Sequence, residues 1–85
     1  MMIHLVFFAR VKEQLQCGDM TIDWQNTLST VASLKAHLGN INGANWTTVL
    51  GEDNLVCAVN QTVVDDQHRL KDGDEVAFFP PVTGG

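Results

Sequence analysis

Apolar and polar positions along the chain divide it into short segments with two different periods. Residues 3–9 form a continuous apolar run, whose length and aromatic content favour a strand over a helix. Residues 20–24 alternate between apolar and polar side chains, which is typical of a half-buried strand. Three further segments, residues 55–59, 62–64 and 75–79, complete a predicted set of five strands.

A helical period is found in one longer segment, residues 27–38. Its apolar face is formed by Leu28, Val31, Ala32 and Leu38. Asn26 or Thr27 is expected to cap the N-terminus with a side-chain oxygen, and Gly39 is expected to end the helix. This segment is predicted to be the principal helix of the chain.

Shorter signals mark the connections between these elements. Residues 10–18 predict one turn of helix closed by Gly18, and another helical turn is expected near residues 46–50. Residues 60–61 predict a turn between two strands. Residues 72–73 predict a tight turn before the last strand, because the glycine accepts the positive φ that such turns need.

The order of these elements predicts the fold class. Five strands and one principal helix in 85 residues make a two-layer α+β domain, with the helix packed on one face of a mixed sheet. A right-handed crossover would place the last strand beside the first in the middle of the sheet. This is the β-grasp, or ubiquitin-like, arrangement. We expect residues 1–81 to form the β-grasp domain and residues 82–85 a flexible C-terminal tail.

Charge and composition exclude several classes of function. Five basic residues against ten acidic ones give a formal net charge of −5, which argues against binding a nucleic-acid backbone or an anionic membrane. It favours partners with basic surfaces. No apolar run approaches the roughly 20 residues of a membrane span, and no export signal is recognised. Cys17 and Cys57 are therefore expected to be reduced thiols in a cytoplasmic protein.

Conventional catalytic clusters are absent from the sequence pattern. The three histidines have no metal-ligand spacing, so neither a metal site nor a cofactor bound by this chain is expected. The acidic groups at residues 65–66 and 72–75 are interpreted as solvated turns. Cys57 falls within an apolar strand, where a thiol behaves as a small, inert hydrophobic group.

The C-terminal segment carries the most informative chemistry. Gly84 and Gly85 follow a rigid Pro80 and Pro81, and six residues from Pro80 can extend about 20 Å. Two residues without Cβ can thread a narrow channel. The tail formed by Pro81, Val82, Thr83 and Gly84 is therefore expected to insert into another protein's active site. It would carry there the carboxylate of Gly85, which ATP can activate by adenylation.

Taken together, these motifs resemble the MoaD family of sulfur carriers, the small subunits of molybdopterin synthase. The resemblance covers the whole length, and it is strongest in residues 6–13, 58–62 and 72–85. The last of these segments reads DGDEVAFFPPVTGG. One departure is Lys12, where the family often has arginine. Lysine keeps the positive charge but cannot form the paired hydrogen bonds of an arginine guanidinium.

The resemblance implies a sequence of events centred on Gly85. A MoeB-type enzyme would use ATP to adenylate Gly85, and a sulfurtransferase system would convert the acyl-adenylate to a thiocarboxylate. The carrier would then dock on a MoaE-type large subunit and give its sulfur to cyclic pyranopterin monophosphate during molybdenum cofactor biosynthesis. The family's assembly is a heterotetramer of two small and two large subunits. The chain alone would be non-catalytic.

The strand pattern also predicts a docking surface. If Ile3, Leu5 and Phe7 face the helix, then Val6 and Phe8 lie on the opposite face of the sheet. The expected partner interface consists of Phe8, Lys12, Val63, Phe79 and Pro80. Two alternatives stay open at this point: Phe7 could face outward instead, or both faces of the strand could be core.

Alternative functions share part of this pattern. A Gly-Gly end would also suit a sulfur carrier of the thiamine pathway or a ubiquitin-like protein modifier, although thiamine carriers typically lack the Phe-Phe-Pro-Pro approach. A pure interaction module with an inert tail is the third hypothesis. Sulfur on Gly85 would exclude the inert tail, and co-purification with a large subunit would identify the first function.

Overall fold

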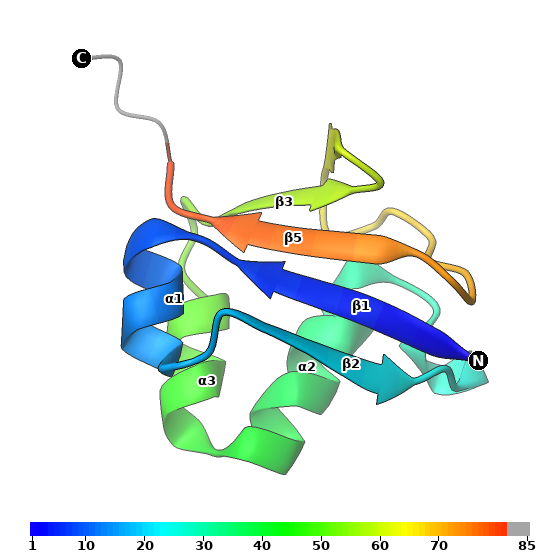
Figure 1. Cartoon of the computed structure of the whole chain (residues 1–85), viewed down its shortest axis with the longest axis horizontal. Coiled ribbons are helices and arrows are strands. Elements are labelled where there is room, and N and C mark those ends of the chain that lie inside the picture. The colour runs from blue at the N-terminus through cyan, green and yellow to red at the C-terminus, as the bar shows by residue number, and fades with distance from the viewer. Residues whose placement is uncertain (82–85) are drawn as a thin grey trace.

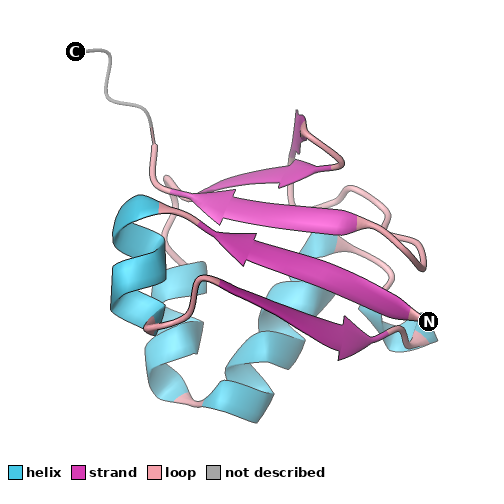
Figure 2. Cartoon of the chain, viewed as in Figure 1, coloured by secondary structure: helices cyan, strands magenta, loops and turns pink. Residues whose placement is uncertain are grey.

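The computed structural model describes residues 1–81, and Figure 1 shows one twisted sheet with the helices gathered on one side of it. The strands are β1 (Met2–Phe7), β2 (Asp19–Asp23), β3 (Val56–Val59), β4 (Thr62–Val64) and β5 (Glu75–Phe79). The helices are α1 (Ala9–Leu15), α2 (Val31–Asn42) and α3 (Ala44–Leu50), and a short 3₁₀ helix, η1 (Asn26–Leu28), precedes α2. The strands follow the spatial order β2-β1-β5-β3-β4 (Figure 2).

Strands β1 and β5, from the two ends of the chain, pair in parallel at the centre of the sheet. The register places Leu5 opposite Val76 and Phe7 opposite Phe78. The other pairings, β1 with β2, β5 with β3 and β3 with β4, are antiparallel. The predicted mixed five-stranded sheet, with the last strand beside the first, is therefore confirmed.

The core lies between the sheet and the helices. Ile3, Leu5 and Phe7 of β1 are buried on the helix side, and Val76 and Phe78 of β5 join them there. The alternating burial along β1 confirms the orientation in which Phe7 faces inward. The alternative with Phe7 outward is wrong, because the continuous apolar run belongs to a central strand whose inner face alone contacts the helices.

Helix α2 begins later than the sequence pattern predicted. Thr30, not Asn26 or Thr27, is its N-cap, since its hydroxyl oxygen accepts a hydrogen bond from the Ser33 backbone N–H at 3.2 Å. Thr30 also forms an isolated β-bridge with Arg69, which keeps the backbone extended up to that residue. The tertiary contact therefore sets the start of the helix.

This later start also changes the buried face of α2. Val31, Leu34 and Leu38 are buried, whereas Ala32 is exposed. Leu28 is buried too, but it belongs to η1. The predicted apolar face thus omitted Leu34 and wrongly included Ala32, because it treated two separate helical elements as one continuous helix.

Gly39 does not end α2, contrary to the prediction. It is a buried residue inside the helix, which continues to Asn42 and ends at Gly43 with a φ of 103°. A Cβ placed on Gly39 would collide with the Thr47 hydroxyl oxygen of α3. Gly39 is therefore a site of close approach between two helices, and Gly43 takes the positive φ that turns the chain into α3.

Helices α1 and α3 are longer than the single turns expected from the sequence. Helix α1 buries Val11 and Leu15 against the core. It ends at Gln16, which has a left-handed backbone with a φ of 55°, so the predicted closure by Gly18 is wrong. In α3, Trp46 packs edge-on against Phe7 with ring centroids 5.3 Å apart. The helical layer therefore contains three helices, where the sequence predicted one principal helix.

Candidate functional site

The face of the sheet opposite the helices carries a row of apolar side chains. Strand register places four residues side by side across β1, β5, β3 and β4: Val6, Ala77, Ala58 and Val63. Paired residues project to the same face of a sheet, so this row lies on the side away from the core. Val63 at the end of the row is 66% exposed. The two alanines keep the middle of the row shallow.

Two phenylalanines stand beside this row where β1 and β5 end. Phe8 follows β1 and is 49% exposed, and Phe79 is the last residue of β5 and is half-buried. Their rings meet edge to face, with centroids 6.3 Å apart and planes at 76°. We call the surface formed by Val6, Phe8, Val63, Ala77 and Phe79 the open-face patch. Exposed apolar patches are common at partner sites on protein surfaces, so this patch is a candidate for one.

Lys12 lies at one border of the open-face patch. Its aliphatic stem passes over Gly18. A Cβ added to Gly18 would lie only 3.2 Å from Lys12 Cε. Gly18 therefore matters for the room that it leaves to Lys12, rather than for ending a helix. Lys12, which is exposed, and Gly18, which is half-buried, line a shallow hollow together with Val6 and Phe8.

Polar side chains line the same hollow as Lys12, next to Val6. His4 Nε2 lies 3.5 Å from Asp19 Oδ2, and His4 Nδ1 lies 3.9 Å from Glu75 Oε2. All three side chains are substantially exposed. The open-face patch is therefore bordered, beside Val6, by a polar group formed by His4, Asp19 and Glu75.

Pro80 and Pro81 continue the chain from Phe79. Because β1 and β5 are parallel, Phe8 and Phe79 leave the sheet at the same end, and both prolines there are half-buried. Pro81 is the last residue that the structure describes. Val82, Thr83, Gly84 and Gly85, together with the prediction of a flexible tail, lie outside the described residues.

The thiols in residues 1–81 have different surroundings. Burial raises the pKa of the Cys57 thiol from 9.0 to about 11, which agrees with the inert thiol expected from the sequence. Cys17 is half-buried, and its Sγ donates to the Asp19 carbonyl oxygen at 3.3 Å.

Within residues 1–81 no group of three or more potential metal ligands is assembled. No described helix is long and apolar enough to cross a membrane.

Asp66 is an exposed turn residue as the sequence suggested, but it is paired, whereas Asp74 is buried and contradicts that prediction. Asp66 accepts a hydrogen bond of 2.7 Å from the Lys35 ammonium. Asp74 is only 4% exposed, and its carboxylate accepts from Asn60 Nδ2 and from the Lys71 backbone N–H. The sequence could not reveal either contact, because the partners come from other elements.

Comparison with known proteins gives a consistent set of relatives. The ThiS family matches residues 5–85. The molybdopterin synthase sulfur carrier subunit of Escherichia coli is 44% identical over 84 residues, which cover 99% of this chain and 100% of that protein. The subunit of the same name in Haemophilus influenzae is 37% identical over the same shares of the two chains.

Solved structures support the same fold. A chain in the complex of subunits 1 and 2 of the molybdopterin-converting factor from Helicobacter pylori has a TM-score of 0.68 and 29% identity, with both chains covered fully. Small archaeal modifier protein 1 of Haloferax volcanii has a TM-score of 0.73 and 22% identity, covering 95% of this chain and 98% of that one. The second likeness concerns the fold alone.

Proposed function

Since the chain belongs to the ThiS family, and its full-length relatives are sulfur carrier subunits of molybdopterin synthase, we propose that it supplies sulfur to a molybdopterin synthase in molybdenum cofactor biosynthesis. The observation that carries this proposal is the 44% identity with the E. coli subunit, which extends over that protein's entire length. For the alternative of a protein modifier, small archaeal modifier protein 1 of Haloferax volcanii is 22% identical, against 44% for the E. coli sulfur carrier subunit.

The proposed chemistry takes place at the carboxylate of Gly85. A MoeB-type partner transfers AMP from ATP to this carboxylate, and pyrophosphate leaves. Sulfide then attacks the acyl carbon and displaces AMP, which leaves a thiocarboxylate on Gly85. The thiocarboxylate gives its sulfur to cyclic pyranopterin monophosphate on the large subunit, and water restores the carboxylate. The residues of this chain position the carboxylate, and the partners supply the catalytic groups.

The open-face patch is the proposed docking surface for the large subunit. The Phe8–Phe79 pair is well placed for this role, because aromatic side chains are enriched at the centres of protein interfaces. Lys12 and Val63 would extend the contact to either side. Pro80 leaves the sheet next to Phe8, so docking through the patch would direct Val82, Thr83, Gly84 and Gly85 towards the partner. The likeness to a chain in the H. pylori complex of subunits 1 and 2 supports a large-subunit partner.

Further parts of the proposal concern the assembly and its location. We expect a MoaE-type large subunit in a heterotetramer and a MoeB-type adenylating enzyme, and we expect ATP to be bound by that enzyme rather than by this chain. The unpaired thiols of Cys17 and Cys57 are consistent with a reducing, cytoplasmic location.

Intact mass spectrometry tests the chemistry directly. The chain is incubated with a MoeB-type enzyme, ATP and sulfide, and its mass is expected to increase by the difference between one sulfur and one oxygen. Addition of a large subunit and cyclic pyranopterin monophosphate should return the mass to its starting value. Deletion of Gly85, or addition of one alanine after it, should prevent the mass change and the formation of molybdopterin.

Thr48→Ser serves as a control, because it changes an exposed residue of α3, away from the tail and the open-face patch. It should accept sulfur as the original chain does. Sulfur transfer at normal rate by the chain with the added alanine would contradict the role of Gly85, provided that the alanine is still present by mass.

A further inference from the structure

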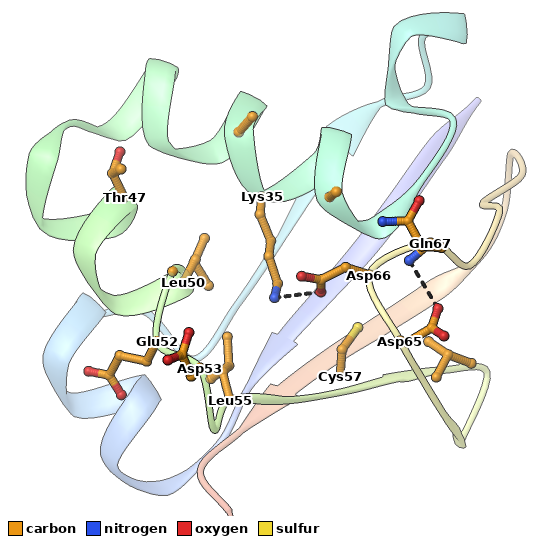
Figure 3. A pocket seen from close by; sticks show the side chains of 14 residues that line it. Lys35, Thr47, Leu50, Glu52, Asp53, Leu55, Cys57, Asp65, Asp66 and Gln67 are labelled. Atoms are coloured by element: carbon orange, nitrogen blue, oxygen red, sulfur yellow. Dashed lines mark hydrogen bonds and ion pairs between the residues drawn. The ribbon is translucent and has the colours of Figure 1, made fainter.

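A groove lies on the helix side of the sheet, where α2 leaves strands β3 and β4 uncovered (Figure 3). It has a volume of about 710 Å³. Its apolar lining is formed by Ala32, Ala36, Leu50, Leu55, Cys57 and Val64. Cys57, at the floor of the groove, is only 4% exposed.

One wall of this groove is an edge strand. Strand β4 pairs only with β3 in the described sheet, so its other side has no neighbouring strand. Residues 60–61 form a two-residue turn, which makes Val59 and Thr62 a hydrogen-bonded pair. The alternation of an antiparallel ladder then directs the backbone N–H and C=O of Val63 away from β3. These two groups are available to a further strand.

The charge at the groove is mainly negative. The lining includes four carboxylates, Glu52, Asp53, Asp65 and Asp66, and one ammonium, that of Lys35. Figure 3 shows Lys35 extending from α2 to Asp66, where the ion pair measures 2.7 Å. The other three carboxylates form no ion pair with residues 1–81. Figure 3 shows Glu52 and Asp53 on one side of the groove and Asp65 on the other, with Cys57 between them, so carboxylates flank the groove.

From these features we infer that the groove binds an extended segment of a partner protein, with alternating apolar residues next to lysine or arginine. The segment adds as a strand to β4, through the backbone of Val63. Its apolar side chains enter the groove between α2 and β3, and its basic side chains pair with the unmatched carboxylates. Strand addition provides affinity through the backbone, and the pockets for alternate side chains provide specificity.

This second site is separate from the proposed docking surface. The groove lies on the helix side of the sheet, whereas the open-face patch lies on the opposite side. Val63 takes part in both sites through different atoms: its side chain belongs to the patch and its backbone to the edge of β4. A partner bound in the groove would therefore leave the patch and the C-terminal tail accessible.

Amide NMR spectra of the full chain, without any other protein, test this inference. The probe is a short capped peptide in which alternating valine and threonine residues lie between pairs of lysines. A second peptide has glutamate in place of each lysine. We expect the lysine peptide to shift the amide signals of Lys35, Val63 and Asp66, and to bind more weakly as salt is added. The glutamate peptide should bind at least several times more weakly.

Two pairs of variants separate the backbone contact from the charge contact. Val63→Pro removes the outward N–H of an edge strand, where proline is tolerated, and should weaken binding roughly fivefold. Val63→Ala keeps this N–H and should bind the peptide as the original chain does. Asp53→Lys should weaken binding about two- to fivefold, whereas Asp23→Lys makes the same charge change on β2 and should have a smaller effect.

Three outcomes would each overturn the inference: no binding of the lysine peptide, equal binding of both peptides, or unchanged affinity in a folded Val63→Pro variant. Signal shifts confined to the open-face patch would also contradict it. The assay contains no ATP and no large subunit, so its failure would leave the sulfur-carrier proposal intact. Conversely, failure of sulfur transfer would leave this peptide site untouched.

Discussion

The carboxylate of Asp74 accepts a hydrogen bond of 2.9 Å from the side-chain amide of Asn60, which joins the β3–β4 turn to the start of β5. Asn60 returns a contact, because its side-chain oxygen accepts from the Glu75 backbone N–H at 3.0 Å. The other Asp74 oxygen accepts from the Lys71 backbone N–H at 2.8 Å. The turn that precedes the central strand β5 is therefore held by side chains from two distant parts of the sequence.

Replacement of Asp74 by alanine should destabilise the fold. It leaves the Asn60 amide and the Lys71 N–H without acceptors, which should cost about 2 kcal/mol or more of unfolding free energy. For a domain of this size the melting temperature should fall by roughly 10 °C. Asp72→Ala, in the same turn but exposed, should change stability by only about 0.5 kcal/mol. Equal melting temperatures for the two variants would contradict the role given to Asp74.

Gly39→Ala should also be destabilising, although alanine favours helices more than glycine does. The new methyl group would collide with the Thr47 hydroxyl and would force α2 and α3 apart. We expect a loss of about 1–3 kcal/mol by chemical denaturation. The double variant Gly39→Ala with Thr47→Ala should recover part of this loss, because the colliding oxygen is removed. A stabilised single variant would show that α3 moves without cost.

Phe79→Ala should affect partner binding more than folding. Phe79 is half-buried on the open face, and truncation of an aromatic interface anchor commonly costs about 2 kcal/mol or more of binding free energy. Calorimetric titration with a large subunit measures this effect, and a thermal melt of the free chain measures stability. Phe78→Ala is the comparison, because Phe78 is fully buried and its truncation should cost about 3–5 kcal/mol of stability.

If Phe79→Ala instead lowered the melting temperature as much as Phe78→Ala, with unchanged affinity in the folded fraction, Phe79 would be a core residue. The proposed docking surface would then have to exclude it.

Cys57 should make stability depend on pH in the alkaline range. Its folded-state pKa of about 11 lies above the ordinary value of 9.0, because burial disfavours the thiolate. Between these two values the unfolded chain loses the thiol proton and the folded chain keeps it. Stability from this group is therefore complete below pH 9 and falls as the pH rises towards 11.

Urea denaturation of the original chain and of Cys57→Ala between pH 8 and 11 would measure this contribution. The alanine variant should lose less stability over that range, since the remaining titrations are common to both proteins. Alkylation at neutral pH should accordingly modify Cys17 well before Cys57. Rapid alkylation of Cys57 in the folded chain would contradict its burial.

The sequence by itself predicted the elements whose signals are local. The five strands and the central pairing of the first and last strands followed from apolar periodicity and connection rules, and the structure confirms them. The orientation of Phe7 stayed open in the sequence, and the alternating burial along β1 shows that Phe7 faces inward. Asn60 and Gln61 have φ values of 50° and 71°, so the predicted turn between β3 and β4 is confirmed as well. The motif near Gly85 predicted the family, which the comparison with known proteins confirms.

Only the tertiary structure decided where helices begin and how polar residues are used. Thr30 caps α2 because Arg69 bridges to it, and Gly39 stays inside the helix because Thr47 packs against it. Asp74 is buried because Asn60 reaches it across a gap of fourteen positions. In each case the deciding partner is distant in sequence. Its contact outweighs the local preference of Asn26 or Thr27 to start a helix, of Gly39 to end one, or of Asp74 to stay in water.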